Sequence, residues 1–252
     1  MPDIRRREIN DFLQARGAVT IAELTEHFPG VSGMTIRRDL EKLERQGELV
    51  RIRGGARSLA NLSLVREAAY TQRVAENYDA KSIIAAKAAR LVTPGLSLYI
   101  DAGTTCMAFT KQLDAENLFV LTPAPNIAME LVRNPRVTVT LTGGQLNRDT
   151  YTLTGFNAVE YVKTLNIQVA FMAASAFSLR DGFTCGYFQE AELKRLIIRK
   201  AQKVVLLMDN SKVGHCLPYT FARLPAIDVL VTDAPLPDEC IQAARKARVE
   251  LP

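Results

Sequence analysis

Apolar segments of strand length recur through the last two thirds of the chain, and this alternation constrains the fold more than any other feature. Amphipathic segments of helical length separate them. Buried strands that alternate with helices are typical of parallel sheets covered on both faces, so the pattern predicts an α/β domain with a mostly parallel sheet. The predicted strands are residues 96–100, 118–122, 137–142, 167–173, 203–208 and 228–232, and the predicted helices are residues 81–92, 106–113, 127–133, 190–201 and 238–247.

Polar residues follow the first of these strands. Ligands of parallel sheets bind beyond the carboxyl ends of the strands. Asp101 ends the strand, and Gly103, Thr104 and Thr105 begin the next helix. Free N–H groups and hydroxyls at a helix start can hold a phosphate without a metal. A turn capped by threonine is the plainer interpretation of the same residues.

Three other segment ends carry groups of the same kind. Gly143 and Gly144 follow a strand and would let the backbone approach a ligand, although a plain turn fits equally well. Lys212 follows another strand and would supply a cation, or is a solvated surface lysine. Glu190 begins a helix, where it would accept ligand hydroxyls or simply be an acid that the helix dipole favours. Together these ends predict a ligand site at one edge of the sheet.

The first 58 residues have a different pattern, of helices followed by a short basic strand. Residues 3–16 are typical of a helix, and Thr20 and Glu23 form a capping box that begins a second one. Ser32 is a favourable N-cap for a third helix over residues 33–46. Helices that meet in tight turns and are followed by a basic hairpin predict a winged helix-turn-helix.

The third helix carries both an apolar stripe and a polar face. Ile36, Leu40 and Leu43 are spaced to lie on one side of it. The side chains that flank or oppose this stripe would meet DNA bases and phosphates, because the first turns of a recognition helix enter the groove. An ordinary amphipathic helix with solvated arginines remains open. Those side chains are Met34, Thr35, Arg37 and Arg38.

The strand that follows alternates over residues 48–53, which places Arg51 and Arg53 on one face. Such a basic wing suits contacts with DNA phosphates. The full set of candidate DNA-contacting residues is Thr20, Ser32, Met34, Thr35, Arg37, Arg38, Arg51 and Arg53.

Charge alone does not prove that the chain binds DNA. The net charge is +5, and residues 1–58 hold 11 basic and 9 acidic side chains, a net of +2. The 4 cysteines form no C-x-x-C pair, so neither a structural zinc site nor another cofactor is expected. Scattered cysteines fit a reduced compartment, and no signal peptide or long apolar run occurs. We therefore expect a cytoplasmic protein that does not bind membranes.

The amino-terminal segment resembles the DeoR family of bacterial repressors. Val31-Ser32, Thr35 to Leu40, Leu43 and Gly54-Gly55-Ala56 carry the resemblance. The chain departs from the family in having two residues, Pro29 and Gly30, before the Val-Ser pair, which lengthens the turn.

The rest of the chain also resembles this family, in its effector domain. Arg73 and Lys81, the Asp101 segment, Gly143-Gly144, Gly182 with Glu190, and Asp209 to Lys212 carry the resemblance, whereas Pro123 departs from it. The family's effector domain is similar to ribose-5-phosphate isomerase and senses phosphorylated sugars. The resemblance implies effector contacts by Lys81, Asp101, Gly103, Thr104, Thr105, Gly143, Gly144, Glu190 and Lys212.

The resemblance also implies an organisation and a function. Residues 1–58 would be the DNA-binding winged helix-turn-helix, residues 59–77 a linker, and residues 78–252 the sensing domain. The chain would be a transcriptional regulator, a repressor of carbohydrate metabolism genes. It would bind operator DNA as a homo-oligomer, a dimer or a tetramer, under the control of a phosphorylated sugar.

Two other functions fit the sequence. One is a sugar-phosphate isomerase with an added amino-terminal domain. Residues 173–178 contain no acid and residues 183–186 no lysine, which leaves only Glu190 as a base, so no enzyme activity is expected. The other is a repressor whose pocket has lost its ligand and serves assembly.

Overall fold

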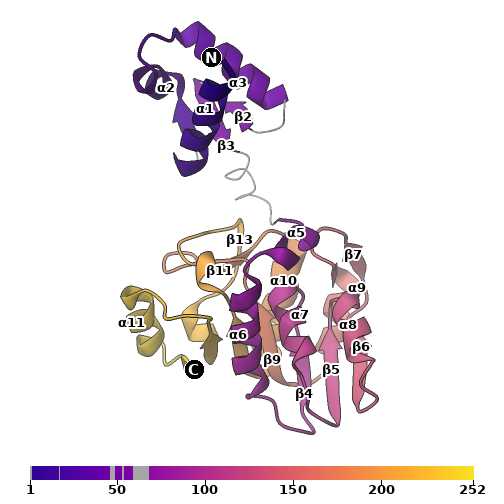
Figure 1. The fold of residues 1–252 in the computed structure, drawn as a ribbon. Helices are drawn as coiled ribbons and strands as arrows, with labels where there is room; N and C mark the ends of the chain where they lie inside the picture. The colour runs from indigo at the N-terminus through magenta and orange to yellow at the C-terminus, as the bar shows by residue number, and fades with distance from the viewer. Residues whose placement is uncertain (1, 17, 46–48, 53, 59–67) are drawn as a thin grey trace. The chain divides into compact units, whose positions relative to one another are not determined.

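The computed structural model describes residues 2–16, 18–45, 49–52, 54–58 and 68–252 (Figure 1). The chain divides into two compact units, Met1–Arg66 and Glu67–Pro252, which we call the head and the α/β unit. The predicted linker reached residue 77, but residues 68–77 belong to the α/β unit. The physical reason is local packing, since Tyr70 is buried and its amide donates to the Asp149 carbonyl at 2.7 Å.

The head packs its helices against a small antiparallel sheet in the order β1-β3-β2. Ile9, Leu24, Ile36 and Leu40 belong to its closed apolar core, which is separate from those of the α/β unit. The predicted helices and the wing strand are present, and the short strand β1 was not predicted. The bounds are α1 (Pro2–Arg16), β1 (Ala18–Thr20), α2 (Ile21–His27), α3 (Gly33–Arg45), β2 (Leu49–Ile52) and β3 (Gly55–Ser58).

A glycine explains how the third strand reaches this sheet. A Cβ atom on Gly55 would lie 2.1 Å from the carbonyl oxygen of Val19, so any other residue would push β3 away from β1. Gly55 pairs with Thr20, and Ala56 with Val19. The double glycine therefore closes the wing onto the body of the head.

The α/β unit is built on a six-stranded sheet in the order β14-β12-β9-β4-β5-β6. Each pair of neighbouring strands is parallel, as the sequence pattern predicted. In the register of the central strands, Ile100 at the end of β4 lies opposite Phe171, so β9 runs two residues farther, to Ala173. The strands are β4 (Ser97–Ile100), β5 (Leu118–Thr122), β6 (Val137–Leu141), β9 (Ile167–Ala173), β12 (Ala201–Leu207) and β14 (Val229–Val231).

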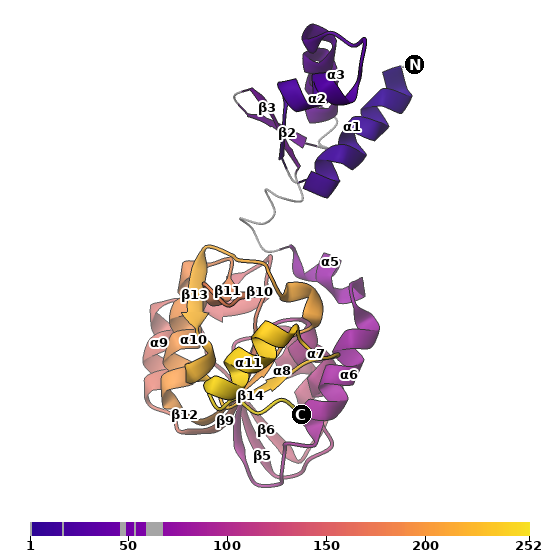
Figure 2. The same ribbon diagram turned by 90° about the vertical axis from the view of Figure 1, so that its left-hand side faces the viewer.

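Helices cover both faces of this sheet, as Figure 2 shows. Side chains that alternate along each strand enter two separate cores, because successive residues of a strand point to opposite faces. In β4, Leu98 packs under α6, α7 and α8, whereas Tyr99 packs under α9, α10 and α11. The bounds are α6 (Tyr78–Ala89), α7 (Thr104–Lys111), α8 (Pro125–Leu131), α9 (Phe156–Lys163), α10 (Phe188–Lys200) and α11 (Asp238–Lys246).

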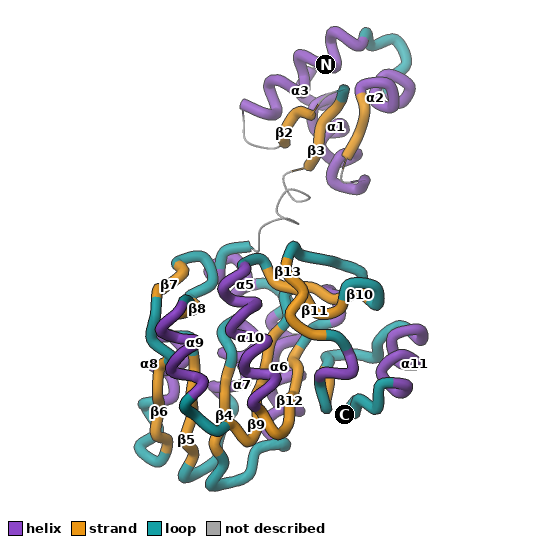
Figure 3. The backbone as a smooth tube through the Cα atoms, turned by 180° about the vertical axis from the view of Figure 1, so that it is seen from behind, coloured by secondary structure: helices purple, strands orange, loops and turns teal. Residues whose placement is uncertain are grey.

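Several short elements were not predicted, and they lie beside the sheet in Figure 3. The strands β7 and β8 pair as an antiparallel hairpin, and β10, β11 and β13 form a small antiparallel sheet. Each spans only a few residues, too few for a clear apolar period. Their bounds, with those of α5 and two 3₁₀ turns, are α5 (Tyr70–Ala75), β7 (Gln145–Asn147), β8 (Thr152–Thr154), β10 (Ala176–Ser178), β11 (Gly182–Cys185), η1 (Asn210–Lys212), β13 (Tyr219–Ala222) and η2 (Leu224–Ala226).

Candidate functional site

Ser32 holds the start of α3. The amide of Thr35 donates to the Ser32 hydroxyl oxygen at 3.3 Å, and the amide of Ile36 donates to the Ser32 carbonyl at 3.1 Å. The oxygen of a short side chain can accept a hydrogen bond from an amide that has no partner inside the helix. The Ser32 and Thr35 hydroxyls also lie 2.9 Å apart, so both are engaged at the helix start.

The inner face of α3 is fixed against α1 by apolar packing and one charged group. Ile36 and Leu40 lie in the head core. Between them Asp39 is buried, and its carboxylate accepts a hydrogen bond from Arg5 at 2.6 Å and lies 3.6 Å from Arg6. A charge pair that spans two helices sets the rotation of α3 about its axis.

This rotation places the candidate DNA-reading side chains on the outside. Met34, Arg37 and Arg38 are exposed, Met34 to 59%. Thr20 is also exposed, but its hydroxyl already serves the capping box with Glu23, whose amide donates to it at 3.2 Å. The outward face of α3 therefore combines two arginines with an apolar tip.

Arg51 differs from the expectation that it is free to contact phosphates. Its guanidinium lies 2.7 Å from the Glu41 carboxylate and 2.8 Å from that of Glu44, both on α3. Its amide also donates to Glu44, and these hydrogen bonds lower the pKa of Glu44. Arg51 therefore joins the wing to α3. Arg53, the other predicted wing contact, lies outside the described residues.

In the α/β unit, Asp101, Glu190 and Lys194 form a buried charge cluster. The Lys194 ammonium contacts Asp101, lies 3.3 Å from a Glu190 oxygen and donates to the Ala173 carbonyl at 3.0 Å. Although burial acts to lower the pKa of Lys194, the two carboxylates raise it above its ordinary value, so the ammonium stays charged. Each member is at most 5% exposed. A single cation thus compensates two buried acids.

Asp101 was expected to face a ligand, but its carboxylate is used inside the protein. One oxygen accepts the amide of Ala102 at 2.9 Å and the other the amide of Ala173 at 3.1 Å. Because Ala102 follows β4 and Ala173 ends β9, the carboxylate joins the ends of two neighbouring strands. We call these two strand ends the floor of the candidate site, and the Asp101 carboxylate holds them together.

Gly103, Thr104 and Thr105 begin α7 just beyond this floor, as predicted. Gly103 has a φ of 118°, a conformation that L side chains rarely adopt, and no side-chain hydrogen bond caps the helix. Thr104 is partly exposed and Thr105 is buried. The start of α7 therefore presents backbone amides and a hydroxyl, which suit an anion.

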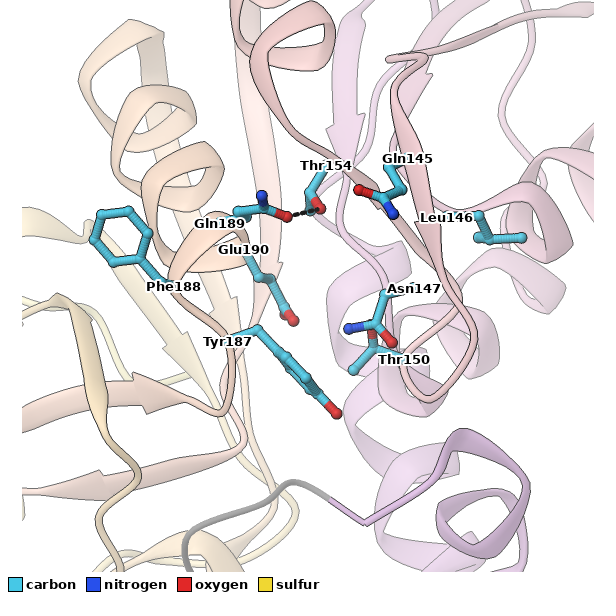
Figure 4. A pocket seen from close by; sticks show the side chains of 9 residues that line it. All are labelled: Gln145, Leu146, Asn147, Thr150, Thr154, Tyr187, Phe188, Gln189 and Glu190. Atoms are coloured by element: carbon cyan, nitrogen blue, oxygen red, sulfur yellow. Dashed lines mark hydrogen bonds between the residues drawn. The ribbon is translucent and has the colours of Figure 1, made fainter.

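A pocket of about 360 Å³ lies between the β7–β8 hairpin and the start of α10 (Figure 4). Thr154 donates to the Gln189 carboxamide across it at 3.4 Å. Carboxamides, hydroxyls, two apolar side chains and the Glu190 carboxylate make up its wall, and no basic side chain is among the described residues that line it. The lining residues are Gln145, Leu146, Asn147, Thr150, Thr154, Tyr187, Phe188, Gln189 and Glu190.

Gly143 and Gly144 precede this hairpin, and the second is required by the chain's own backbone. A Cβ atom on Gly144 would lie 2.3 Å from the carbonyl oxygen of Thr154, whereas one on Gly143 would meet nothing within 4 Å. The expected close approach of backbone is therefore real, but at Gly144 it is made by β8 in place of a ligand.

Lys81 and Lys212 were both expected to contact the effector. They lie near Asp209, and Lys81 is buried. The Lys81 ammonium donates to the carbonyls of Arg73 and Glu76, so this buried lysine caps the end of α5. Burial lowers the pKa of Lys81, the charge of Asp209 raises it and Lys212 lowers it further. Lys212 is partly exposed in the 3₁₀ turn η1. Lys81 is thus a positioning residue for α5.

Both parts of the chain match known families. The DeoR-like helix-turn-helix domain matches residues 5–61, and the DeoR C terminal sensor domain matches residues 76–234. The chain belongs to the DeoR family. This DeoR-family regulator is similar along most of its length to curated transcriptional regulators, as the resemblance of its motifs predicted.

Two relatives show the extent of the similarity. The regulator GlpR of Haloferax volcanii is 34% identical over 237 residues, which is 94% of this chain and 91% of that protein. The transcriptional repressor GlcR of Bacillus subtilis (strain 168) is 32% identical over 227 residues, 89% of this chain and 86% of that protein. A solved structure of D-ribose-5-phosphate isomerase has 13% identity over 54% of each chain and a TM-score of 0.41.

The DeoR-family regulator has candidate site residues that the sequence did not reveal. Lys194 completes the charge cluster, and Asn147, Tyr187 and Gln189 line the pocket. One signal was present, since Glu190 and Lys194 are four residues apart on a helix and so share a face.

Among the described residues, no helix combines the length and the apolarity that crossing a bilayer requires.

Proposed function

We propose that the chain represses genes of sugar metabolism by binding operator DNA as a homo-oligomer, and that a phosphorylated sugar releases it. The name of the relative GlcR, a transcriptional repressor, supports the direction of regulation. The proposed DNA contacts are Met34, Thr35, Arg37 and Arg38 on α3, with a smaller phosphate contribution from the wing.

One observation carries the proposed effector class. The polar pocket has the Glu190 carboxylate in its wall, and Glu190 connects through Lys194 to Asp101, just before the start of α7. A helix start suits a phosphate, and carboxamides with a carboxylate suit sugar hydroxyls, which both donate and accept hydrogen bonds. We therefore assign the phosphate to Gly103, Thr104 and Thr105, and the hydroxyls to the pocket.

Thermal unfolding with a panel of phosphorylated sugars tests this assignment. The panel is glucose 6-phosphate, fructose 6-phosphate, ribose 5-phosphate and glycerol 3-phosphate, each beside its unphosphorylated counterpart. A ligand that binds the native state raises the unfolding temperature, by an amount that grows with the ratio of its concentration to its dissociation constant. We expect at least one phosphorylated member to stabilise the protein and to weaken operator binding, and its counterpart to do neither.

Valine substitutions locate the phosphate. Replacing Thr104 and Thr105 with valine keeps the shape of the helix start and removes both hydroxyls, so the response to the sugar phosphate should fall while operator binding persists. Thr110→Val is the matched control, since its hydroxyl bonds within the same helix, to the Cys106 carbonyl at 2.8 Å. An unchanged dose–response in the double variant would place the phosphate elsewhere.

The isomerase alternative predicts turnover, and our proposal predicts none. Isomerisation needs a base and groups that polarise the carbonyl. Glu190 is the candidate base, but its carboxylate already lies 3.3 Å from the Lys194 ammonium, inside the buried charge cluster. Conversion of ribose 5-phosphate above a no-protein control, abolished by Glu190→Gln, would support the enzyme instead.

A further inference from the structure

The turn of the β7–β8 hairpin contacts both the pocket and the beginning of α5. We infer that Asp149, in this turn, carries the effector signal from the pocket to α5 and from there along the chain to the head. This inference rests on the proposed function and adds how the site is coupled to DNA release.

On the pocket side, two lining residues hold Asp149. The phenol of Tyr187 donates to an Asp149 carboxylate oxygen at 3.0 Å. The Asn147 side-chain oxygen accepts the amide of Asp149 at 2.9 Å. Both residues also line the pocket (Figure 4). A ligand that draws either side chain toward itself therefore changes the hydrogen bonds of Asp149.

On the other side, Asp149 and its neighbour hold the first residue of α5. The Asp149 carbonyl accepts the amide of Tyr70 at 2.7 Å. The ring of Tyr70 stacks on the ring of Tyr151, with centroids 4.8 Å apart. Tyr70 is 8% exposed, and burial raises the pKa of its phenol. Because the head precedes Tyr70 in the sequence, the chain that leads to the head departs from this contact.

The backbone of the turn supports a change between two states. Tyr151 has a φ of 56°, the left-handed conformation that a bulky residue rarely adopts. Such a conformation persists where surrounding contacts hold it. Here the contacts are the stacking on Tyr70 and a hydrogen bond from the Tyr151 amide to the Asn147 carbonyl, at 2.8 Å. Losing the bonds of Asp149 would let the turn relax and would free Tyr70.

Two variants of the full chain cut this connection at different atoms. Asp149→Ala removes the acceptor of the Tyr187 phenol. Tyr70→Pro removes both the amide that donates to Asp149 and the ring that stacks on Tyr151. Proline fits the backbone because Tyr70 is the first residue of α5 and Ala69 has φ −56° and ψ 146°. Arg148→Ala is the matched control, since its side chain is 95% exposed and pairs with Asp149 at 3.9 Å.

Each protein is measured in two assays with the most stabilising sugar phosphate of the panel. Calorimetry gives the dissociation constant of that compound, and fluorescence anisotropy gives operator affinity with and without it. We expect wild type and Arg148→Ala to lose about 5- to 150-fold in operator affinity on saturation, the usual range of allosteric coupling. Asp149→Ala and Tyr70→Pro should lose less than about 2-fold while they bind the compound within about 3-fold of wild type.

The outcomes separate the inference from the proposed function. If both variants bind the sugar phosphate and release DNA as wild type does, Asp149 does not carry the signal. If release falls only in proportion to lost sugar binding, the contacts merely shape the pocket and the inference is again wrong. A wild-type protein that responds to no member of the panel overturns the proposed function, and the inference with it.

Discussion

Lys194 is the residue whose charge the α/β unit depends on most. It lies between Asp101 and Glu190 with 2% of its surface exposed. A buried ion pair adds little stability over an apolar substitute, but loss of one partner leaves a charge without compensation. Here the loss of the Lys194 ammonium would leave two buried carboxylates, after β4 and at the start of α10, without a counter-ion.

We predict that Lys194→Met destabilises the protein by about 3–5 kcal/mol. Urea unfolding measures the change, and Glu192→Gln on the exposed side of the same helix should stay within about 0.5 kcal/mol of wild type. In the double variant with Asp101→Asn, the loss should be smaller than the sum of the two single losses, because they share one interaction. Additive losses would contradict the pairing.

The adjacent glycines before the hairpin allow a second comparison of single residues. Gly143 has a φ of 70° and open space around it, whereas Gly144 has a φ of 103° and faces the Thr154 carbonyl. Gly143→Ala should cost about 1–2 kcal/mol in unfolding free energy, from backbone strain alone. Gly144→Ala should cost more, since β8 must also shift. Equal midpoints in urea would show that the hairpin moves without penalty.

At the scale of elements, α3 and the wing divide the work of the head. Apolar packing and Asp39 fix the inner face of α3, and in the part of the chain that the structure describes its outer arginines form no ion pair. Arg51 of the wing is paired with two acids of α3. Its cation is therefore partly neutralised before DNA arrives.

We predict that Arg37→Ala and Arg38→Ala each weaken specific operator binding by about 1–3 kcal/mol and that thermal stability is unchanged. Arg51→Ala should weaken binding less, because that cation is already compensated. Lys42→Ala, one turn later on the exposed face of α3, is the control. Gel shifts on the operator measure specific binding, and gel shifts on a scrambled duplex measure non-specific binding. Wild-type affinity after both arginines are replaced would remove α3 from the interface.

At the scale of the whole molecule, the two units have separate cores and one covalent connection. The first 58 residues carry a net charge of only +2, which gives weak non-specific attraction to DNA. Tethering heads in one assembly makes the second half-site an intramolecular target and raises avidity by about 10²–10⁴.

We therefore predict that residues 1–66, which end where the head ends, bind operator at least about 100-fold more weakly than the full chain. Anisotropy titrations of both proteins on one duplex measure the ratio, and a half-site duplex serves as the control on which the two should agree. A fragment that binds the whole operator as tightly as the full chain would show that the α/β unit contributes nothing to affinity.

Local patterns in the sequence determined the longer helices and the strands of the six-stranded sheet. Strand positions 118–122 and 167–173 agree with β5 and β9 to the residue, and Thr20 and Ser32 begin the helices they were predicted to cap. These features depend on neighbours within one turn or one strand, so apolar period and capping chemistry suffice to find them. They also carried the resemblance to the family.

Tertiary structure alone decided which polar groups pair when they lie far apart in the sequence. Lys194 meets Asp101 from 93 residues away, Gly144 gives room to the carbonyl of Thr154, and Arg51 turns to acids of α3 instead of outward. The sequence marked Asp101 as a ligand contact because it follows a strand, and the family resemblance marked Lys81. Folding buried both, and a buried charge must take its partner from whatever the packing brings near.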